Sequence, residues 1–146
     1  MNLFLPILAT IVAGIGVAIQ TPTNATLART SGSVVLAALI SFLVGTLAIA
    51  ILWAAIDRTP PALLRAAPPW AWAGGLYGAV FVMVAAYAAP RLGVASMLTI
   101  AIAGQLVAAL VIDHFGLLGM RIEPVSPVRL AGLALVVAGV VLVRRG

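Results

Sequence analysis

Three carboxamide side chains lie within or beside apolar runs and are the residues of this sequence best suited to bind a solute. Gln20 and Asn24 are four positions apart in the segment GIGVAIQTPTNATLAR (residues 14–29), so on a helix they share one face. Gln105 lies near the middle of a later apolar run. An amide that finds no hydrogen bond away from water is costly, so each must pair with another helix or face a cavity. The three amides are therefore the candidate binding residues.

Pro22 lies between the first two amides, and two interpretations of this segment stay open. Proline lacks an N–H and clashes with the carbonyl of Ala18, so it breaks or kinks a helix. In the first interpretation the helix breaks near Pro22, and Gln20, Asn24 and the freed carbonyls face a polar vestibule. In the second the helix simply ends and TPTN is a turn. Gln20 is about 25 Å along a helix that starts with the first apolar run, close to the far interface, which favours the turn.

The composition indicates an integral membrane protein. Of 146 residues, 64% are hydrophobic and 8% charged, and the mean hydropathy is +1.27, more apolar surface than a soluble domain of this length can bury. There is no cysteine and one histidine, and no carboxylates lie at metal-binding spacing, so we expect no metal, no cofactor and no catalytic residue. A membrane enzyme is therefore the least favoured class of function.

Five apolar runs have the length of membrane spans, for which about 20 residues suffice. They are Leu3–Ile19, Val34–Ile56, Trp70–Ala89, Gly93–Ile112 and Val128–Val143. The connections between them are too short to fold separately. The sequence predicts an all-α polytopic membrane protein, a bundle of five transmembrane helices forming a single domain over residues 1–146.

Small residues recur at spacings of four or seven inside the spans, which is typical of close helix packing in lipid. The stripes are Ala37, Ser41, Gly45 and Ala48 in the second span, Gly74, Gly78, Ala85 and Ala89 in the third, and Ala101, Gly104 and Ala108 in the fourth. Gly132 and Gly139, seven apart in the fifth span, are the candidate dimer interface. Tyr77 and Phe81 could line a cavity with their rings, although aromatic residues in a bundle more often pack.

The basic residues are all arginines, and an odd number of spans divides them equally between the two sides of the membrane. Arg58, Arg65, Arg121 and Arg129 fall on the side of the N-terminus, and Arg29, Arg91, Arg144 and Arg145 on the other. Orientation follows the Lys/Arg asymmetry of short loops, so an equal division favours insertion in both directions. A fixed topology set by other features is the alternative. The arginines are scattered singly, which argues against binding nucleic acid.

Insertion in both directions suggests how so short a chain could transport a solute. Many transporters combine two halves of inverted topology around a site near the midplane, and this chain shows no internal repeat. One chain would then be one half of an inverted-symmetry dimer, completed by a second, antiparallel copy or by a paralogous partner.

The chain resembles the drug/metabolite transporter superfamily, most closely its small five-helix YdcZ-type members. The resemblance rests on residues 14–29, on SGSVVLAALISFLVGTLAIAIL (31–52), on AIAGQLVAALVIDHFGLLG (101–119) and on PVRLAGLALVVAGVVLVRR (127–145). It implies a multi-pass protein of the plasma (inner) membrane that works as a dimeric transporter. The last three spans also resemble small multidrug resistance exporters, which depend on a glutamate in their first helix. Here Asp57 and Asp113 lie only at span ends, which favours neutral hydrogen bonding or facilitated movement.

We therefore expect a secondary transporter half that moves a small organic solute across the lipid bilayer by alternating access. The alternative is a non-transporting accessory or assembly subunit that packs beside a partner. A polar cavity lined by Gln20, Asn24 and Gln105 favours transport, whereas the same amides consumed by helix–helix hydrogen bonds favour the accessory role.

Overall fold

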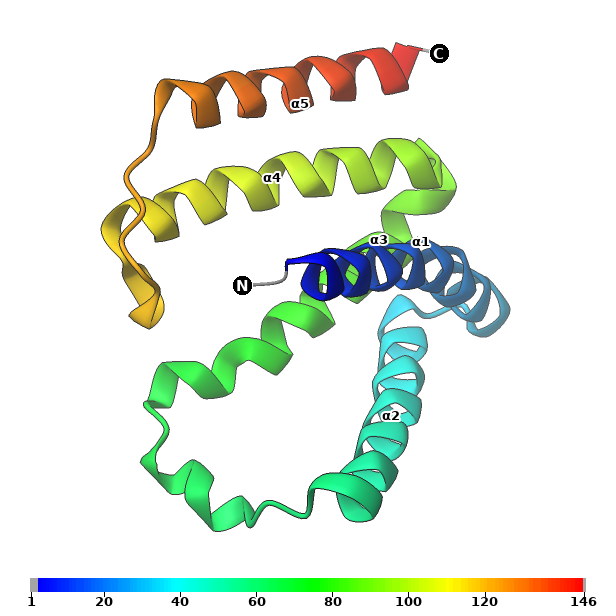
Figure 1. Cartoon of the computed structure of the whole chain (residues 1–146). Coiled ribbons are helices and arrows are strands. Elements are labelled where there is room, and N and C mark those ends of the chain that lie inside the picture. Colours follow the sequence, from blue (N-terminus) through cyan, green and yellow to red (C-terminus); the bar gives the residue numbers. More distant parts are fainter. Residues whose placement is uncertain (1–2, 146) are drawn as a thin grey trace. The chain divides into compact units, whose positions relative to one another are not determined.

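The computed structural model describes residues 3–145, which form helices and no strand. The five long helices are α1 (Phe4–Ser31), α2 (Val34–Leu52), α3 (Gly74–Leu92), α4 (Val94–Phe115) and α5 (Pro127–Arg145) (Figure 1). All five are long and apolar enough to cross a membrane, α2 together with the turn that follows it and α3 with the turn that precedes it. The prediction of an all-α protein with five membrane spans is confirmed.

Four short helices occupy the connections. The π-helix η1 (Trp53–Asp57) continues α2, the 3-10 helices η2 (Pro61–Ala66) and η3 (Pro69–Ala73) lead to α3, and the 3-10 helix η4 (Leu117–Gly119) follows α4. Both η2 and η3 begin with a proline, whose fixed φ suits a first helical turn, while the proline-rich composition prevents a longer helix.

The first span differs from its predicted bounds, because α1 continues through Pro22 as far as Ser31. Both interpretations of the TPTN segment are therefore wrong: the helix neither breaks at Pro22 nor ends there. Threonine hydroxyls in this stretch donate to carbonyls four residues back, Thr21 to Val17, Thr23 to Ile19 and Thr26 to Pro22, each over 2.9 Å. None of these acceptors is the Ala18 carbonyl, from which Pro22 removes the backbone donor, so the helix passes the proline without a threonine replacing that bond.

The chain divides into two compact units, Met1–Arg91 and Leu92–Gly146, and a single domain over the whole length stays a prediction. In the first unit small residues bring three helices together. Ala28 of α1, Ala37 of α2 and Ala86 of α3 form its buried core, and the side chain of Val34 packs against them. Alanines leave no bulk between helices, so backbones approach closely, as the stripe of small residues in α2 predicts.

The contact between α2 and α3 has the same character. A Cβ atom at Gly78 would lie 3.3 Å from the Phe42 ring, so the glycine of α3 makes room for an aromatic side chain of α2. Further along α3, Ala85 and Ala89 are buried, at 3% and 4% exposure. Of the predicted small-residue stripe of the third span, Gly78 packs against α2 and the two alanines are buried, whereas Gly74 has nothing within 4 Å of an added Cβ atom.

In the second unit α4 and α5 lie side by side and run in opposite directions (Figure 1). Gly116 ends α4 with a positive φ of 61°, and its N–H donates to the carbonyl of Asp113 over 3.3 Å. A Cβ atom at Gly116 would lie 2.6 Å from the Ile122 side chain, so this turn requires glycine both for its backbone conformation and for space.

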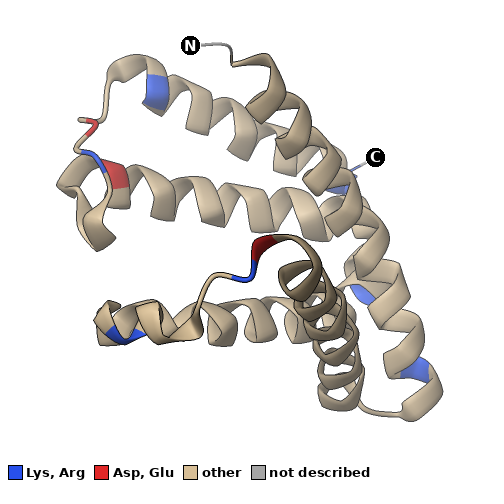
Figure 2. Ribbon diagram, turned by 60° about the horizontal axis from the view of Figure 1, so that its bottom comes forward, with Lys and Arg blue, Asp and Glu red and all other residues tan. Residues whose placement is uncertain are grey.

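Charged residues lie at or near the ends of the long helices and in the connections (Figure 2). Arg29 and Arg91 are in the last turns of α1 and α3, and Arg144 and Arg145 end α5. This placement suits helices whose middle portions face lipid and whose ends reach the headgroups.

Candidate functional site

A small cleft between α1 and α2 brings one predicted amide into a polar setting. It has a volume of about 190 Å³ and is lined by Gln20, Ser41, Phe42, Gly45, Thr46 and Ile49. The Gln20 Nε2 donates to the Ser41 Oγ over 3.5 Å. The lining combines an amide and two hydroxyls with an aromatic ring and an aliphatic side chain, and it carries no charge. A site of this kind can recognise a solute by neutral hydrogen bonds.

The continuous α1 changes the depth at which Gln20 lies. Arg29 is nine residues further along the helix, about 13.5 Å at 1.5 Å per residue. Since half of the hydrocarbon core is about 15 Å thick, an Arg29 held at the headgroups places Gln20 near the middle of the bilayer. Ser41 is likewise eight residues, about 12 Å, from the cap residue Ser33 at the start of α2. The expectation that Gln20 lies close to the interface rested on a span that ends near Ile19. Because α1 extends to Ser31, its position now favours the middle of the span, and its depth in the bilayer stays a prediction.

Asn24 does not share the cleft with Gln20. Its side chain is buried, at 3% exposure, as is that of Thr21, whereas Gln20 is exposed. The Thr21 hydroxyl returns to its own helix, but the Asn24 amide makes no side-chain hydrogen bond to any residue in 3–145. The two amides of the quoted segment thus occupy different surroundings on one helix.

The other predicted site residues line neither this cleft nor the groove described next. On α3, Tyr77 is 70% exposed and Phe81 is half-buried. On α4, Gln105 is exposed, and within the described chain its side chain has no hydrogen-bond partner. Their assignment to a binding site stays a prediction.

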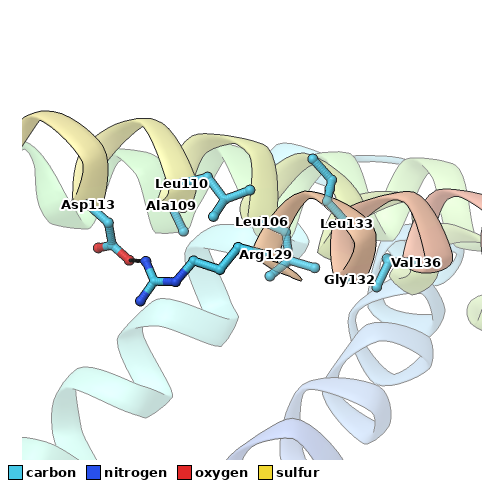
Figure 3. A pocket seen from close by; sticks show the side chains of 8 residues that line it. All are labelled: Leu106, Ala109, Leu110, Asp113, Arg129, Gly132, Leu133 and Val136. Atoms are coloured by element: carbon cyan, nitrogen blue, oxygen red, sulfur yellow. Dashed lines mark ion pairs between the residues drawn. The ribbon is translucent and has the colours of Figure 1, made fainter. Parts of the chain in front are cut away.

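A second, larger hollow is a groove between α4 and α5, with a volume of about 380 Å³. Figure 3 shows its lining: Leu106, Ala109, Leu110, Asp113, Arg129, Gly132, Leu133 and Val136. The walls are apolar, and the side chains of Asp113 and Arg129 point toward one another at one end. Gly132, a candidate for the dimer interface, therefore contributes to a groove within the second unit.

Arg129 joins the end of α4, the following connection and the start of α5. Its Nη1 lies 3.6 Å from the Asp113 Oδ2, and its Nη2 lies 3.1 Å from the Glu123 Oε2. Arg121 adds an outer ion pair to Glu123 at 3.8 Å. The sequence analysis did not predict this cluster. The sequence does contain a pattern that indicates the ion pair: Asp113 and Arg129 lie at facing ends of consecutive spans that one short connection joins.

The two hollows offer different chemistry. In the groove the charged atoms already satisfy one another through ion pairs, and the remaining lining is apolar. In the cleft the amide and hydroxyl groups are held only by one long hydrogen bond and can turn to a solute. No group of three His, Asp or Glu side chains in residues 3–145 could hold a metal ion. The cleft is therefore the better candidate for recognising a polar solute.

Comparisons with known proteins identify the family. Residues 5–142 match the family described as "Putative inner membrane exporter, YdcZ". The chain is 30% identical over 148 aligned positions to the inner membrane protein YdcZ of Escherichia coli (strain K12), covering 99% of this chain and 98% of that protein. No solved structure matches the chain. With its five spanning helices, the chain belongs to the YdcZ family of the drug/metabolite transporter type and is a multi-pass inner membrane protein with a transporter role.

Proposed function

We propose that this chain is one half of a secondary transporter that moves a small organic solute by alternating access, working as an antiparallel dimer. The observation that carries the proposal is the Gln20–Ser41 pair, which lines a cleft at mid-span depth. Binding sites of inverted-repeat transporters lie near the bilayer midplane, where one site can be opened to either side in turn. Family membership supports the transporter role itself.

The cleft suggests the chemistry of the solute. Its polar groups are the carboxamide of Gln20 and the hydroxyls of Ser41 and Thr46, so the part of the solute that enters is neutral and both donates and accepts hydrogen bonds. The 3.5 Å bond between Gln20 and Ser41 is at the long end of hydrogen-bond distances, so a solute can replace it at small cost. Phe42 and Ile49 provide apolar contact beside these groups.

The dimer in this proposal follows from the equal division of the arginines and the absence of an internal repeat. A paralogous partner of opposite orientation would meet the same requirement. On α5, both Gly132 and Gly139 have open space where a Cβ atom would lie, although Gly132 also lines the groove with α4, so a further helix would pack beside that groove. Asn24, Tyr77 and Phe81 remain proposed contributors to the solute path in the assembled transporter.

The test is transport by the purified chain reconstituted in vesicles, screened against a panel of neutral polar solutes and a panel of organic cations. We expect saturable, protein-dependent movement of members of the neutral panel. Transport of cations alone would contradict the neutral site. No transport of either panel, together with stable capture of a partner membrane protein, would favour the accessory role instead.

A further inference from the structure

Gln105 occupies a special position on α4. Eleven residues of the helix precede it and ten follow it, so it lies at the centre of a span that is otherwise apolar around it. The side chain is exposed, and in the described part of the chain its amide makes no hydrogen bond. Lipid tails cannot supply a donor or an acceptor, so an amide at this depth requires a partner that the second unit does not provide.

The packing of α5 leaves this face of α4 open. The residues of α4 that face the groove with α5 are Leu106, Ala109, Leu110 and Asp113. At 100° per residue, Gln105 lies about a quarter of a turn from the centre of that set. Gly104, about 100° further around α4 and away from α5, has nothing within 4 Å of the place a Cβ atom would take, so α4 is open on that side of Gln105 as well.

We infer that Gln105 pairs with Gln105 of a second copy, in an antiparallel contact between two α4 helices. A carboxamide donates and accepts at once, so two identical amides form a reciprocal pair of hydrogen bonds. Chains inserted in opposite directions are related by a two-fold axis in the membrane plane, and only residues at mid-depth then meet their own copies. Gln105 fulfils this condition. The inference rests on the proposed antiparallel dimer but not on transport.

Pairs of cysteines test the geometry in the full chain, which has no cysteine of its own. Leu98 and Ile112 lie seven residues before and after Gln105 and share its face of α4. In the antiparallel contact, Leu98 of one copy lies near Ile112 of the other. Co-expressed Leu98→Cys and Ile112→Cys chains should therefore form a disulfide-linked dimer on mild oxidation in membranes, whereas either variant expressed alone should not.

The amide itself is tested in the same cysteine background. Gln105→Leu should lower the yield of linked dimer at least five-fold without lowering the amount of folded protein, because the side chain has no partner in its own chain. Thr99→Val is the matched control on α4. Its hydroxyl already donates to the carbonyl of Ala95 over 2.7 Å, so the linked-dimer yield should not change. Gln105→Asn, which keeps an amide, should restore part of the yield.

Four results would overturn the inference. Linked dimers from either single-cysteine variant alone would show a parallel contact. An unchanged yield after Gln105→Leu would show that the amide does not hold the contact, and a large loss of folded protein would place its partner within the same chain. A fourth result is that the cysteine pair forms no linked dimer with Gln105 intact, while photo-crosslinking, which does not depend on the cysteines, still detects a dimer. The Gln105–Gln105 contact would then be wrong, and the proposed antiparallel dimer would stand. If neither detects a dimer, both fail.

Discussion

The Gln20 amide donates to the Ser41 hydroxyl across the contact between α1 and α2, over 3.5 Å, within two helices that are long and apolar enough to span a membrane. This pair gives the cleft its polar wall. In the proposed transporter Gln20 releases Ser41 to bind the solute. Gln20→Leu should therefore lower solute affinity about five-fold, as expected for one hydrogen bond of about 1 kcal/mol, while the amount of folded protein changes little.

Binding to reconstituted protein, with folded protein quantified by size-exclusion chromatography, measures both effects. Thr10→Val is the control on α1, because the Thr10 hydroxyl donates to the carbonyl of Pro6 over 2.8 Å and lies outside the cleft. It should leave affinity unchanged. Equal loss of folded protein and of binding in Gln20→Leu would mean that the Gln20–Ser41 bond serves packing, which is the accessory interpretation.

Water access to the cleft gives an independent prediction that needs no known solute. Ser41→Cys is nearly isosteric, and a thiol reacts only as the thiolate, which requires water. Ser41→Cys should therefore be labelled by a charged thiol reagent several-fold faster than Val44→Cys, which lies three residues further along α2, is 64% exposed and lies outside the cleft. Solutes that bind should slow labelling of Ser41→Cys alone. Equal rates at the two positions would argue against an aqueous cleft.

Arg129 should stabilise the packing of α4 against α5 through its ion pairs with Asp113 and Glu123. The side chains of Arg129 and Glu123 are 37% and 47% exposed, so solvent screens the pair, and we expect a coupling free energy of about 0.5–1 kcal/mol. A double-mutant cycle of Arg129→Gln and Glu123→Gln, read by thermal unfolding in detergent, measures it. The cycle of Arg121→Gln with Glu123→Gln should give a coupling near zero, because the Arg121 side chain is 90% exposed. A larger coupling for Arg121 than for Arg129 would contradict this prediction.

The turn after α4 should be sensitive to a single methyl group. In Gly116→Ala the alanine must adopt the left-handed backbone conformation, which costs about 1–2 kcal/mol. Its Cβ atom would also lie 2.6 Å from the Ile122 side chain. Gly119→Ala is the matched control, with a φ of 76° but open space around the added carbon. Both variants should unfold at lower temperature than the parent, Gly116→Ala by more. Equal shifts would mean that the connection moves away from the clash freely.

Helix content and span positions could be predicted from the sequence because apolar length alone sets them in a bilayer. The end of α1 could not. The sequence shows that Pro22 removes one backbone hydrogen bond, but it does not show that the helix nevertheless continues to Ser31. This one boundary moves Gln20 from the expected end of the first span to near its middle.

The candidate site, too, could be predicted only in part from the sequence. Gln20 was identified from its residue type, but its partner Ser41 depends on how α1 and α2 pack, which spacing along one helix does not determine. Asn24 shares a helix face with Gln20 by spacing and is nevertheless buried, since neighbouring helices cover the end of α1 more closely than its middle. Gln105 was recognised as an amide that requires a partner, and the described chain contains none.

Topology provides the last prediction, because the equal division of arginines leaves orientation undecided. A reporter fused to the C-terminus should give signal on both sides of the membrane. Adding two lysines beside Arg29, at the end of α1, should hold the turn between α1 and α2 and the C-terminus in the cytoplasm. If transport requires two opposite orientations, this variant should insert normally and lose transport. Co-expression with a second variant that carries two lysines beside Arg65, and is therefore fixed the opposite way, should restore transport. A strongly one-sided signal from the unmodified chain, or full transport by either fixed variant alone, would contradict the antiparallel homodimer and favour a paralogous partner or a single fixed orientation.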